Sequence, residues 1–341
     1  MQNNRPSQKV FILAKIVLGI GTSHTPMLNL TAAQWQHRAA VDYANKELNM
    51  SDGRRLTYPE LLAERGPRYE DSITLDVLTH KEQACHAALD KLGDALEKAN
   101  PDVVIIVGDD QAELFSHANQ PAFAIYNGEN MVTYVGKYAE GAPDWLRQVG
   151  RGYLMENNYS LPACPAFATE LIEGLMEHDV DVASVAGVDD PTKAGFGHAY
   201  GFIVKRLFRR SIPVVPVMLN TYFAPNVPKA SRCHDVGVKL RQVIEASPSD
   251  LRVAIVASGG LSHFIVDEEL DRQVLNAFQQ NDAQALRAIP RNALKSGSSE
   301  ILNWILTAGA VSPMPLAWSE YQPLHRTAAG TGVGAAFCVW K

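Results

Sequence analysis

The sequence predicts an α/β fold, because short apolar runs alternate along the chain with longer helical stretches. Four runs have the length and the β-branched composition of buried strands: 17–20, 102–107, 214–219 and 253–257. Among the segments between them, 77–98 has the clearest helical stripe of apolar residues. The 341 residues contain no internal repeat, low-complexity linker or shift in composition, so we expect a single domain.

The composition is typical of an enzyme that acts on small molecules. Hydrophobic residues make up 46% of the chain, charged residues make up 20%, and the net charge is −6. Because no cluster of Lys and Arg is interleaved with aromatic residues, we expect no nucleic-acid partner. No apolar run reaches the length of a membrane span, so we expect no membrane partner.

The cysteines and the start of the chain predict a cytoplasmic protein. The cysteines lie far apart and lack the spacing of a metal site, which predicts free thiols in a reducing compartment: Cys85, Cys164, Cys233 and Cys338. Residues 1–9 are polar, and Lys15 interrupts the apolar run that follows them. We interpret this start as an irregular tail before the first strand and not as a signal peptide.

The first strand delivers a histidine to its carboxyl end. The apolar run 17–20 stops at a turn, Gly21-Thr22-Ser23, which presents His24 before Pro26 ends any regular structure. An α/β fold binds ligands and metals at this end of its strands, although a capping or core histidine is the alternative. The Gly19-x-Gly21 pair does not indicate a dinucleotide site, because His24 stands where the third Gly would be needed.

The segment 29–68 is polar and helical, and it is longer than a connection between a strand and a helix requires. We interpret it as a helical insertion that folds over a site as a lid. A decorative helical hairpin and an oligomer contact are the alternatives. On the helix 77–98 that follows, His80 and His86 have no partner at metal-ligand spacing and are interpreted as surface histidines.

A second candidate site segment follows the strand 102–107. This strand leads into residues 108–113, which include the acids Asp109, Asp110 and Glu113. Three acids after a buried strand are costly to leave unpaired, so they indicate a site. Beyond this segment we expect a β-hairpin of 122–126 and 131–135 across Asn127-Gly128, then a helix at 167–177 and a strand at 180–185.

Further histidines and an acid lie at starts of helices or ends of strands. His198 lies in the first turn of a helix at 197–208, where the helix dipole disfavours imidazolium and favours a neutral base. The strand 253–257 runs into a glycine turn that ends in His263. Ser298 is expected to cap a helix at 299–308 that stops at Gly309.

Glu300 lies in the first turn of that last helix, where the helix dipole favours a carboxylate. A purely structural role therefore remains an alternative for Glu300. His325 is expected in a loop before a last strand at 335–340.

Imidazoles and carboxylates in such positions suit a non-haem Fe(II) site with open positions for oxygen chemistry. Five short motifs occur in the order in which a known family has them: Ser23-His24-Thr25-Pro26, Gly108-Asp109-Asp110, Gly197-His198, SGGLSH at 258–263 and SGSSEILNW at 296–304. Together they resemble the catalytic subunit of class III extradiol ring-cleavage dioxygenases, the family of the protocatechuate 4,5-dioxygenase β-chain. The resemblance covers nearly the whole chain except 29–68. It implies a three-layer α/β/α domain with a mixed central sheet, Fe(II) as cofactor, and a small aromatic substrate and O2 as partners; we also expect a homo-oligomer.

The resemblance also implies roles for single residues. In that family a His after the first strand, a His after the second strand and a late Glu hold the iron, while another His acts as acid and base. Carried over, His24 and Glu300 are metal ligands and His198 is the acid/base residue. The remaining candidates to contact the substrate or to support the ligands are His263, His325, Asp110 and Glu113.

The chain departs from the family pattern at the second ligand. Where the family has Asp-His after the second strand, this chain has Asp110-Gln111. Gln111 offers only a neutral amide oxygen, which is a poorer ligand than imidazole. Either Gln111 replaces the His as a ligand, or Glu113 or another group takes that position, or the metal site is altered or lost.

The family often acts on catecholic acids, such as protocatechuate, gallate or methylated gallates. Candidates to bind the substrate carboxylate are Lys229, Arg232, Arg54 and Arg55. Protocatechuate enzymes of the family place a small helical subunit over the pocket, and the insertion 29–68 is a candidate to supply that cover in cis. Two other functions remain open: a metal-dependent hydrolase or lyase, and a non-catalytic relative of the fold.

Overall fold

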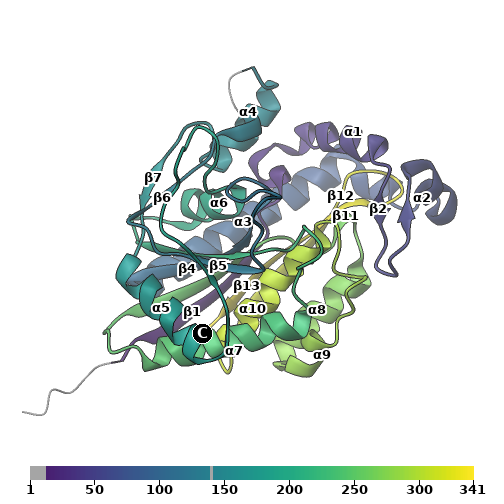
Figure 1. The fold of residues 1–341 in the computed structure, drawn as a ribbon. Helices are drawn as coiled ribbons and strands as arrows, with labels where there is room; N and C mark the ends of the chain where they lie inside the picture. The colour runs from purple at the N-terminus through teal and green to yellow at the C-terminus, as the bar shows by residue number, and fades with distance from the viewer. Residues whose placement is uncertain (1–12, 139–140) are drawn as a thin grey trace, which may run out of the picture.

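A mixed sheet forms the centre of the fold in a computed structural model that describes residues 13–138 and 141–341 (Figure 1). Within these residues the strands follow the order β11-β13-β1-β10-β4-β9-β5-β8, and β12 pairs with β13. Pairing is parallel from β1 through β10 and β4 to β9, and antiparallel pairs flank this parallel centre. The strands are β1 (Lys15–Thr22), β4 (Val103–Asp109), β5 (Phe123–Tyr126), β8 (Ala183–Val185), β9 (Val214–Leu219), β10 (Arg252–Ser258), β11 (His263–Ile265), β12 (Leu316–His325) and β13 (Thr331–Trp340).

Helices cover both faces of this sheet, as expected for three layers. One face carries α3 and α6, and the other carries α5, α7 and α10 (Figure 1). The helices are α1 (Gln36–Ala44), α2 (Tyr58–Arg65), α3 (Leu75–Ala99), α4 (Asp144–Gly152), α5 (Pro165–Glu177), α6 (His198–Leu207), α7 (Ala230–Ala246), α8 (Glu268–Gln280), α9 (Ala283–Arg287) and α10 (Ile301–Val311). In the described residues, no helix has the length and apolar character needed to cross a membrane.

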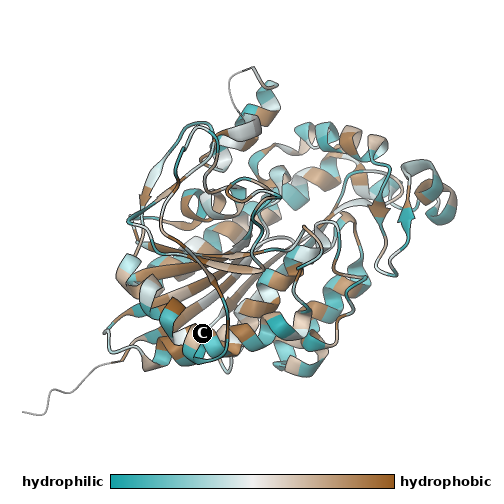
Figure 2. Cartoon of the chain, in the orientation of Figure 1, coloured by the Kyte–Doolittle hydropathy of each residue, from teal (hydrophilic) through white to brown (hydrophobic). Residues whose placement is uncertain are grey.

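Strand β4 shows why its sequence is apolar without interruption. Val104 and Ile106 pack into the core under α3 and α6, whereas Val103, Ile105 and Val107 pack into the core under α7 and α10. Successive side chains of a strand point to opposite faces, so a strand covered on both faces needs apolar residues at every position. Figure 2 shows the same apolar character along the central strands.

The insertion 29–68 is helical in part and also holds a short sheet. It contains α1 and α2, and between them β2 (Leu48–Asn49) pairs with β3 (Arg55–Leu56).

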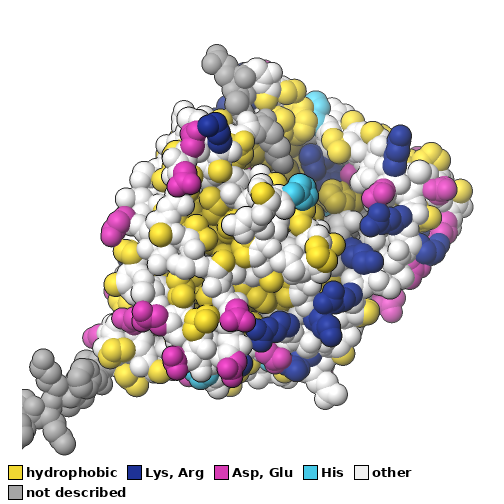
Figure 3. Space-filling model, viewed as in Figure 1, with side chains coloured by type: hydrophobic (Ala, Val, Ile, Leu, Met, Phe, Trp, Pro, Cys, Tyr) yellow, Lys and Arg dark blue, Asp and Glu magenta, His cyan; other side chains and the backbone are white. Residues whose placement is uncertain are grey.

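On the face of the molecule shown in Figure 3, basic and acidic side chains occur side by side. The four cysteines are all free, as the sequence predicts.

The prediction of a β-hairpin across Asn127-Gly128 is wrong. Strand β5 pairs with β8 and β9 inside the central sheet, whereas β6 (Asn130–Val132) pairs with β7 (Ser160–Pro162) in a separate sheet. All residues of β5 are buried. Because both edges of β5 are already paired, the chain after the turn has no free edge beside it.

The last helix also differs from its prediction. Ser298 lies in a 3-10 turn, η5 (Ser298–Glu300), and its hydroxyl bonds to the backbone of His263 instead of capping the helix. Helix α10 then continues through Gly309 to Val311. A Cβ on Gly309 would overlap the carbonyl of His234 on α7, so this glycine serves close helix packing and not helix termination.

Candidate active site

The site lies at the carboxyl ends of three adjacent parallel strands. His24 follows β1, Asp109 ends β4, and Ser258 ends β10, which lies between the other two strands. In open α/β sheets this edge is where ligands bind. The cavity there has a volume of about 110 Å³, and its lining includes the predicted residues His24, Gln111, His198, His263 and Glu300.

A larger cavity of about 1400 Å³ is lined by residues of the insertion, of the start of α3 and of α4. It is lined largely by apolar side chains, among them Trp35, Leu78 and Trp145. None of the predicted site residues lines it. The candidate ligands therefore gather at the smaller cavity and not at this one.

The hydrogen bonds of His24 fix which of its ring nitrogens carries the proton. Ser258 Oγ donates its only proton to the Ala199 carbonyl at 2.6 Å. The same oxygen lies 2.9 Å from His24 Nδ1, so it must accept a hydrogen bond from the Nδ1 proton. In the neutral ring, His24 Nε2 is then unprotonated.

Two further imidazoles have the same arrangement. His198 Nδ1 lies 2.7 Å from Glu113 Oε1, and His263 Nδ1 lies 3.0 Å from the Leu261 carbonyl. Both partners are acceptors, so each neutral ring carries its proton on Nδ1 and has an unprotonated Nε2. Metal-binding histidines commonly show this pattern, in which the other ring nitrogen donates to an outer acceptor.

The lone pairs of two imidazoles converge on one carboxylate. Glu300 Oε2 lies 3.3 Å from His24 Nε2 and 3.5 Å from His263 Nε2. Burial lowers the pKa of His263, which favours its neutral form. Burial raises the pKa of Glu300, whereas the positive charge of protonated His263 and His24 lowers it below its ordinary value. Acceptors that face each other at these distances require a shared proton or a cation between them.

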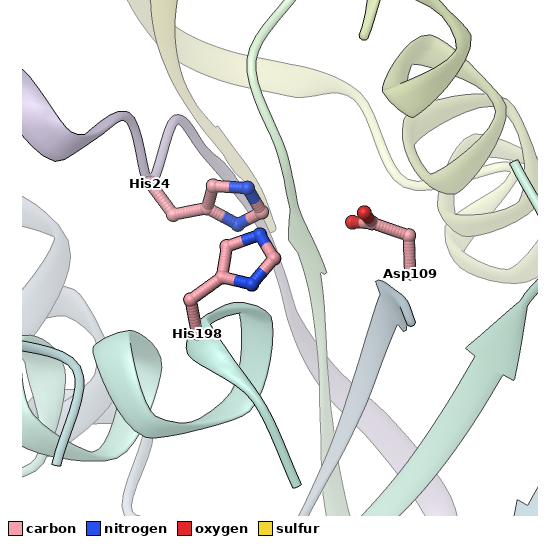
Figure 4. A group of neighbouring side chains, drawn as sticks. All are labelled: His24, Asp109 and His198. Atoms are coloured by element: carbon pink, nitrogen blue, oxygen red, sulfur yellow. The ribbon is translucent and has the colours of Figure 1, made fainter. Parts of the chain in front are cut away.

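A second group of possible ligands adjoins the first. His24, Asp109 and His198 are buried, and each offers a ligand atom within 4.8 Å of the others. Figure 4 shows the two imidazoles close together and the Asp109 carboxylate pointing toward them from the end of β4. Burial, followed by the charge of Glu300, raises the pKa of Asp109 to about 6. Two buried carboxylates among unprotonated imidazoles therefore fit a divalent metal cation.

Gln111 lies on the Asp109 side of the cavity. Its amide Nε2 donates to Asp109 Oδ2 at 3.1 Å and lies 3.3 Å from His198 Nε2. The amide thus connects Asp109 to His198. Gln111 shares the cavity wall with His24 and Glu300, the other two residues expected to bind the metal.

Glu113 and Asp110 have distinct positions in the loop after β4. Glu113 bonds to His198, and Gly197 allows this approach because a Cβ there would overlap the Glu113 carboxylate. Asp110 accepts hydrogen bonds from the backbone N–H groups of Ala112, Leu114 and Phe115, and so holds the loop. Burial, followed by the charge of Glu113, raises the pKa of Asp110 to about 6.

His325 does not join the other candidates. It ends β12 and does not lie in the predicted loop. Its ring stacks on Tyr69 with 4.0 Å between ring centres, and it is not among the residues that line the cavity. Burial lowers the pKa of His325 to about 3, so its ring is neutral near pH 7.

The structure adds residues that the sequence analysis did not select. Asn303 Nδ2 donates to the Ser258 carbonyl at 2.9 Å and lies 3.4 Å from Asp109 Oδ1. The Tyr222 hydroxyl donates to Glu300 Oε1 at 3.1 Å, and Arg38 lines the cavity from the insertion. Asn303 could have been selected from the sequence, because it lies three residues after Glu300 and residues at this spacing are neighbours on a helix. No comparable local pattern indicates Arg38 or Tyr222.

The sequence is similar to known ring-opening dioxygenases. The model of a family described as the catalytic LigB subunit of aromatic ring-opening dioxygenase matches residues 72–337. A gallate dioxygenase of Pseudomonas putida is 30% identical over 158 residues, which cover 43% of this chain and 45% of that protein. The family match begins after the insertion 29–68.

A second type of relative is named for different substrates. A 2,3-dihydroxyphenylpropionate/2,3-dihydroxicinnamic acid 1,2-dioxygenase of Mycobacterium ulcerans is 28% identical over 211 residues, 61% of this chain and 55% of that protein. A protein of the same name from Mycobacterium sp. is 28% identical over 184 residues, 51% of this chain and 50% of the relative. The chain therefore spans about half the length of the curated relatives it matches.

Proposed function

The chain belongs to the family of the catalytic LigB subunit of aromatic ring-opening dioxygenases, and from this premise we propose a specific reaction for it. It opens the ring of a catecholic aromatic acid with O2, in an extradiol reaction that depends on Fe(II). The observation that carries the proposal is the convergence of unprotonated imidazole nitrogens of His24 and His263 on the Glu300 carboxylate. Imidazole and carboxylate ligands with open positions suit Fe(II) in oxygen chemistry.

We propose His24 and Glu300 as ligands and Gln111 as the third. Asp109 is the rival for the third position, since its carboxylate lies within 4.8 Å of the ligand atoms of His24 and His198. Bound Fe(II) supplies the Lewis-acid and redox chemistry that allows O2 to react with the aromatic ring. The protein's part is to hold the ligands in place, and Ser258 does this for His24.

His198 is proposed to move the proton. Glu113 holds its Nδ1 proton, so the unprotonated Nε2 lies on the cavity side, next to Gln111. In that state Nε2 accepts a proton from a substrate hydroxyl and returns it as the ring opens. Glu113 also stabilises the imidazolium that exists between these two steps.

A single aromatic ring with a carboxylate is the substrate that the site supports best. A cavity of about 110 Å³ is of the same order as the roughly 150 Å³ that holds one benzene in a protein interior. The relatives named above act on gallate and on dihydroxyphenylpropionate, which are both carboxylates.

The free thiols support a location in a reducing compartment, the cytoplasm.

Oxygen uptake tests the proposal directly. Protein loaded with Fe(II) under anaerobic conditions is mixed with aerated catecholic acids, and O2 is followed with an electrode while absorbance is recorded. We expect one O2 consumed per substrate and a yellow ring-opened product. Iron bound in stoichiometric amount, together with no oxygen uptake across a panel of catechols, would contradict the reaction.

A further inference from the structure

Arg38 stands out among the residues around the cavity. It lies on α1 of the insertion, and it is the one Lys or Arg among the described residues that line the cavity. Tyr138 and Tyr153 also line this cavity. Arg38 therefore brings a positive charge to the lining of the cavity.

The guanidinium of Arg38 has no carboxylate partner in the described part of the chain. No Asp or Glu there forms an ion pair with it, and its Nε is buried without a hydrogen-bond partner. A buried charged donor is costly to leave without an acceptor. An anionic ligand in the cavity would supply that acceptor.

The nearest acid on the same helix is already committed elsewhere. Asp42 lies four residues after Arg38, the usual spacing for a helical ion pair. Its two oxygens instead accept from Arg326, at 2.7 Å from Nε and 3.0 Å from Nη2, and Thr331 Oγ1 also donates to it. This buried pair fastens α1 to the segment between β12 and β13 and leaves the charge of Arg38 uncompensated.

The arginines selected from the sequence have different surroundings. Arg54 pairs with Asp52 and Glu64, and Arg55 pairs with Glu47, all at exposed positions. Neither arginine lines the cavity, and neither do Lys229 and Arg232. Arg38 is thus the basic residue in the right place to meet an anion bound in the cavity.

We propose that Arg38 binds the carboxylate of the aromatic substrate, so that the insertion 29–68 selects catecholic acids over uncharged catechols. The inference rests on the proposed function and adds a residue that confers specificity. A guanidinium matches a carboxylate with two parallel N–H donors, which gives orientation as well as affinity. The carboxylate held at Arg38 directs the opposite side of the ring, with its hydroxyls, toward His24 and Glu300.

The test compares two substrates in matched variants. Arg38→Met keeps the apolar stem and removes the charge, Arg38→Lys keeps the charge, and Arg55→Met is the control from the same insertion. For Arg38→Met we expect kcat/KM to fall about 100-fold with a catecholic acid and by less than about threefold with unsubstituted catechol. Arg38→Lys should recover part of the loss, and Arg55→Met should match the parent protein. Equal losses of Arg38→Met on both substrates would overturn the proposal.

A binding measurement separates this inference from the proposed reaction. Isothermal titration calorimetry with 3-hydroxybenzoate, which has a carboxylate but no catechol, needs no turnover. We expect Arg38→Met to bind it at least about tenfold more weakly than the parent protein and Arg55→Met to bind it equally well. If the parent opens no ring but this difference is found, the reaction is wrong and the anion site stands. If the reaction occurs and Arg38→Met binds 3-hydroxybenzoate as the parent does, the anion site is wrong. Thermal unfolding of each variant confirms that it is folded, and Arg38→Gln replaces Arg38→Met if the latter is not.

Discussion

At the scale of single residues, the site depends on where each histidine keeps its proton. Ser258, Glu113 and the Leu261 carbonyl each accept from an Nδ1 proton. These acceptors lie outside the cavity, and the Nε2 atoms of the three neutral rings carry no proton. The hydrogen-bond network therefore prepares a site that favours a cation before any metal binds.

The role of Gln111 can be tested by restoring an imidazole. Gln111→His replaces a neutral amide oxygen with a better donor for Fe(II), so iron affinity should rise. Iron binding is measured by anaerobic titration against a competing chelator. The same change removes the amide that joins Asp109 to His198, so turnover serves only as a second readout.

Companion variants identify the third ligand. Asp109→Asn should strip the metal only if Asp109 occupies that position, and Glu113→Ala should do so only if Glu113 has swung away from His198. Unchanged iron affinity in Gln111→His, combined with loss of iron in Asp109→Asn, would transfer the assignment from Gln111 to Asp109.

The proposed acid/base role of His198 predicts that loss of this side chain lowers turnover without loss of iron binding. His198→Ala should keep its iron and lose about 100-fold or more of kcat, because general acid/base catalysis contributes on that order. Iron content and oxygen uptake are measured on the same sample. Should the variant lose its iron as well, His198 is a ligand, in line with its position near His24 and Asp109.

Asp271 predicts how stability depends on pH, away from the cavity. Burial raises the pKa of Asp271 from its ordinary value of 3.8 to about 7, although Ser262 and Tyr321 donate hydrogen bonds to it. Between these two values the unfolded chain has released the proton while the folded protein retains it. The stability that protonated Asp271 contributes is therefore fully present below the unfolded-state pKa and is lost as pH rises through the folded-state pKa.

Urea unfolding at pH 4 to 8 checks this dependence. Asp271→Asn cannot ionise, so its free energy of unfolding should fall less across that range than in the parent protein. Asp250→Asn, a change at an exposed acid, is the control and should keep the parent's slope. Identical slopes in the parent and in Asp271→Asn would contradict a raised pKa.

At the scale of elements, the sequence predicted those features that depend on neighbours in the chain. His24 and Asp109 come shortly after apolar runs, so their place at strand ends could be inferred from residues 17–24 and 102–109. His198 lies in the first turn of α6, as predicted. In each case a local pattern determined the position.

Features that depend on remote partners could not be predicted in this way. Asn127-Gly128 satisfies the local rule for a hairpin, but β5 is paired on both edges by β8 and β9 from later in the chain. Gly309 has the composition of a helix stop, but its role is set by the His234 carbonyl on α7. Arg38 reaches the cavity only because tertiary packing places α1 beside it.

The anchor of α1 gives a prediction at this scale. Asp42→Ala leaves Arg326 buried without its partner, which should lower the free energy of unfolding by about 3–5 kcal/mol. Asp52→Ala breaks an exposed pair in the same insertion and should cost at most about 1 kcal/mol. Chemical denaturation measures both. A loss for Asp42→Ala as small as that for Asp52→Ala would show that the buried pair does not hold α1.

At the scale of the whole molecule, the candidate site joins parts of the chain that are far apart in sequence. His24 follows β1, Asp109 ends β4, His198 begins α6, His263 begins β11, and Glu300 ends η5. Because these residues are far apart in the sequence, they meet only in the folded protein. In the sheet β10 lies between β1 and β4, and α6 and η5 approach the site from outside the sheet. A metal bound there stabilises the global fold, since the unfolded chain has no such site.

Metal loading should therefore raise the temperature of global unfolding. Fe(II) at 100 times its dissociation constant contributes about 2.7 kcal/mol, which corresponds to a rise in Tm of roughly 4 °C for a domain of this size. Differential scanning calorimetry under anaerobic conditions, with and without EDTA, measures the shift. His24→Ala should abolish the shift, whereas His80→Ala, a change at an exposed histidine on α3, should preserve it. A shift that persists in His24→Ala would place the stabilising metal outside this cavity, because His24 belongs to both groups of possible ligands there.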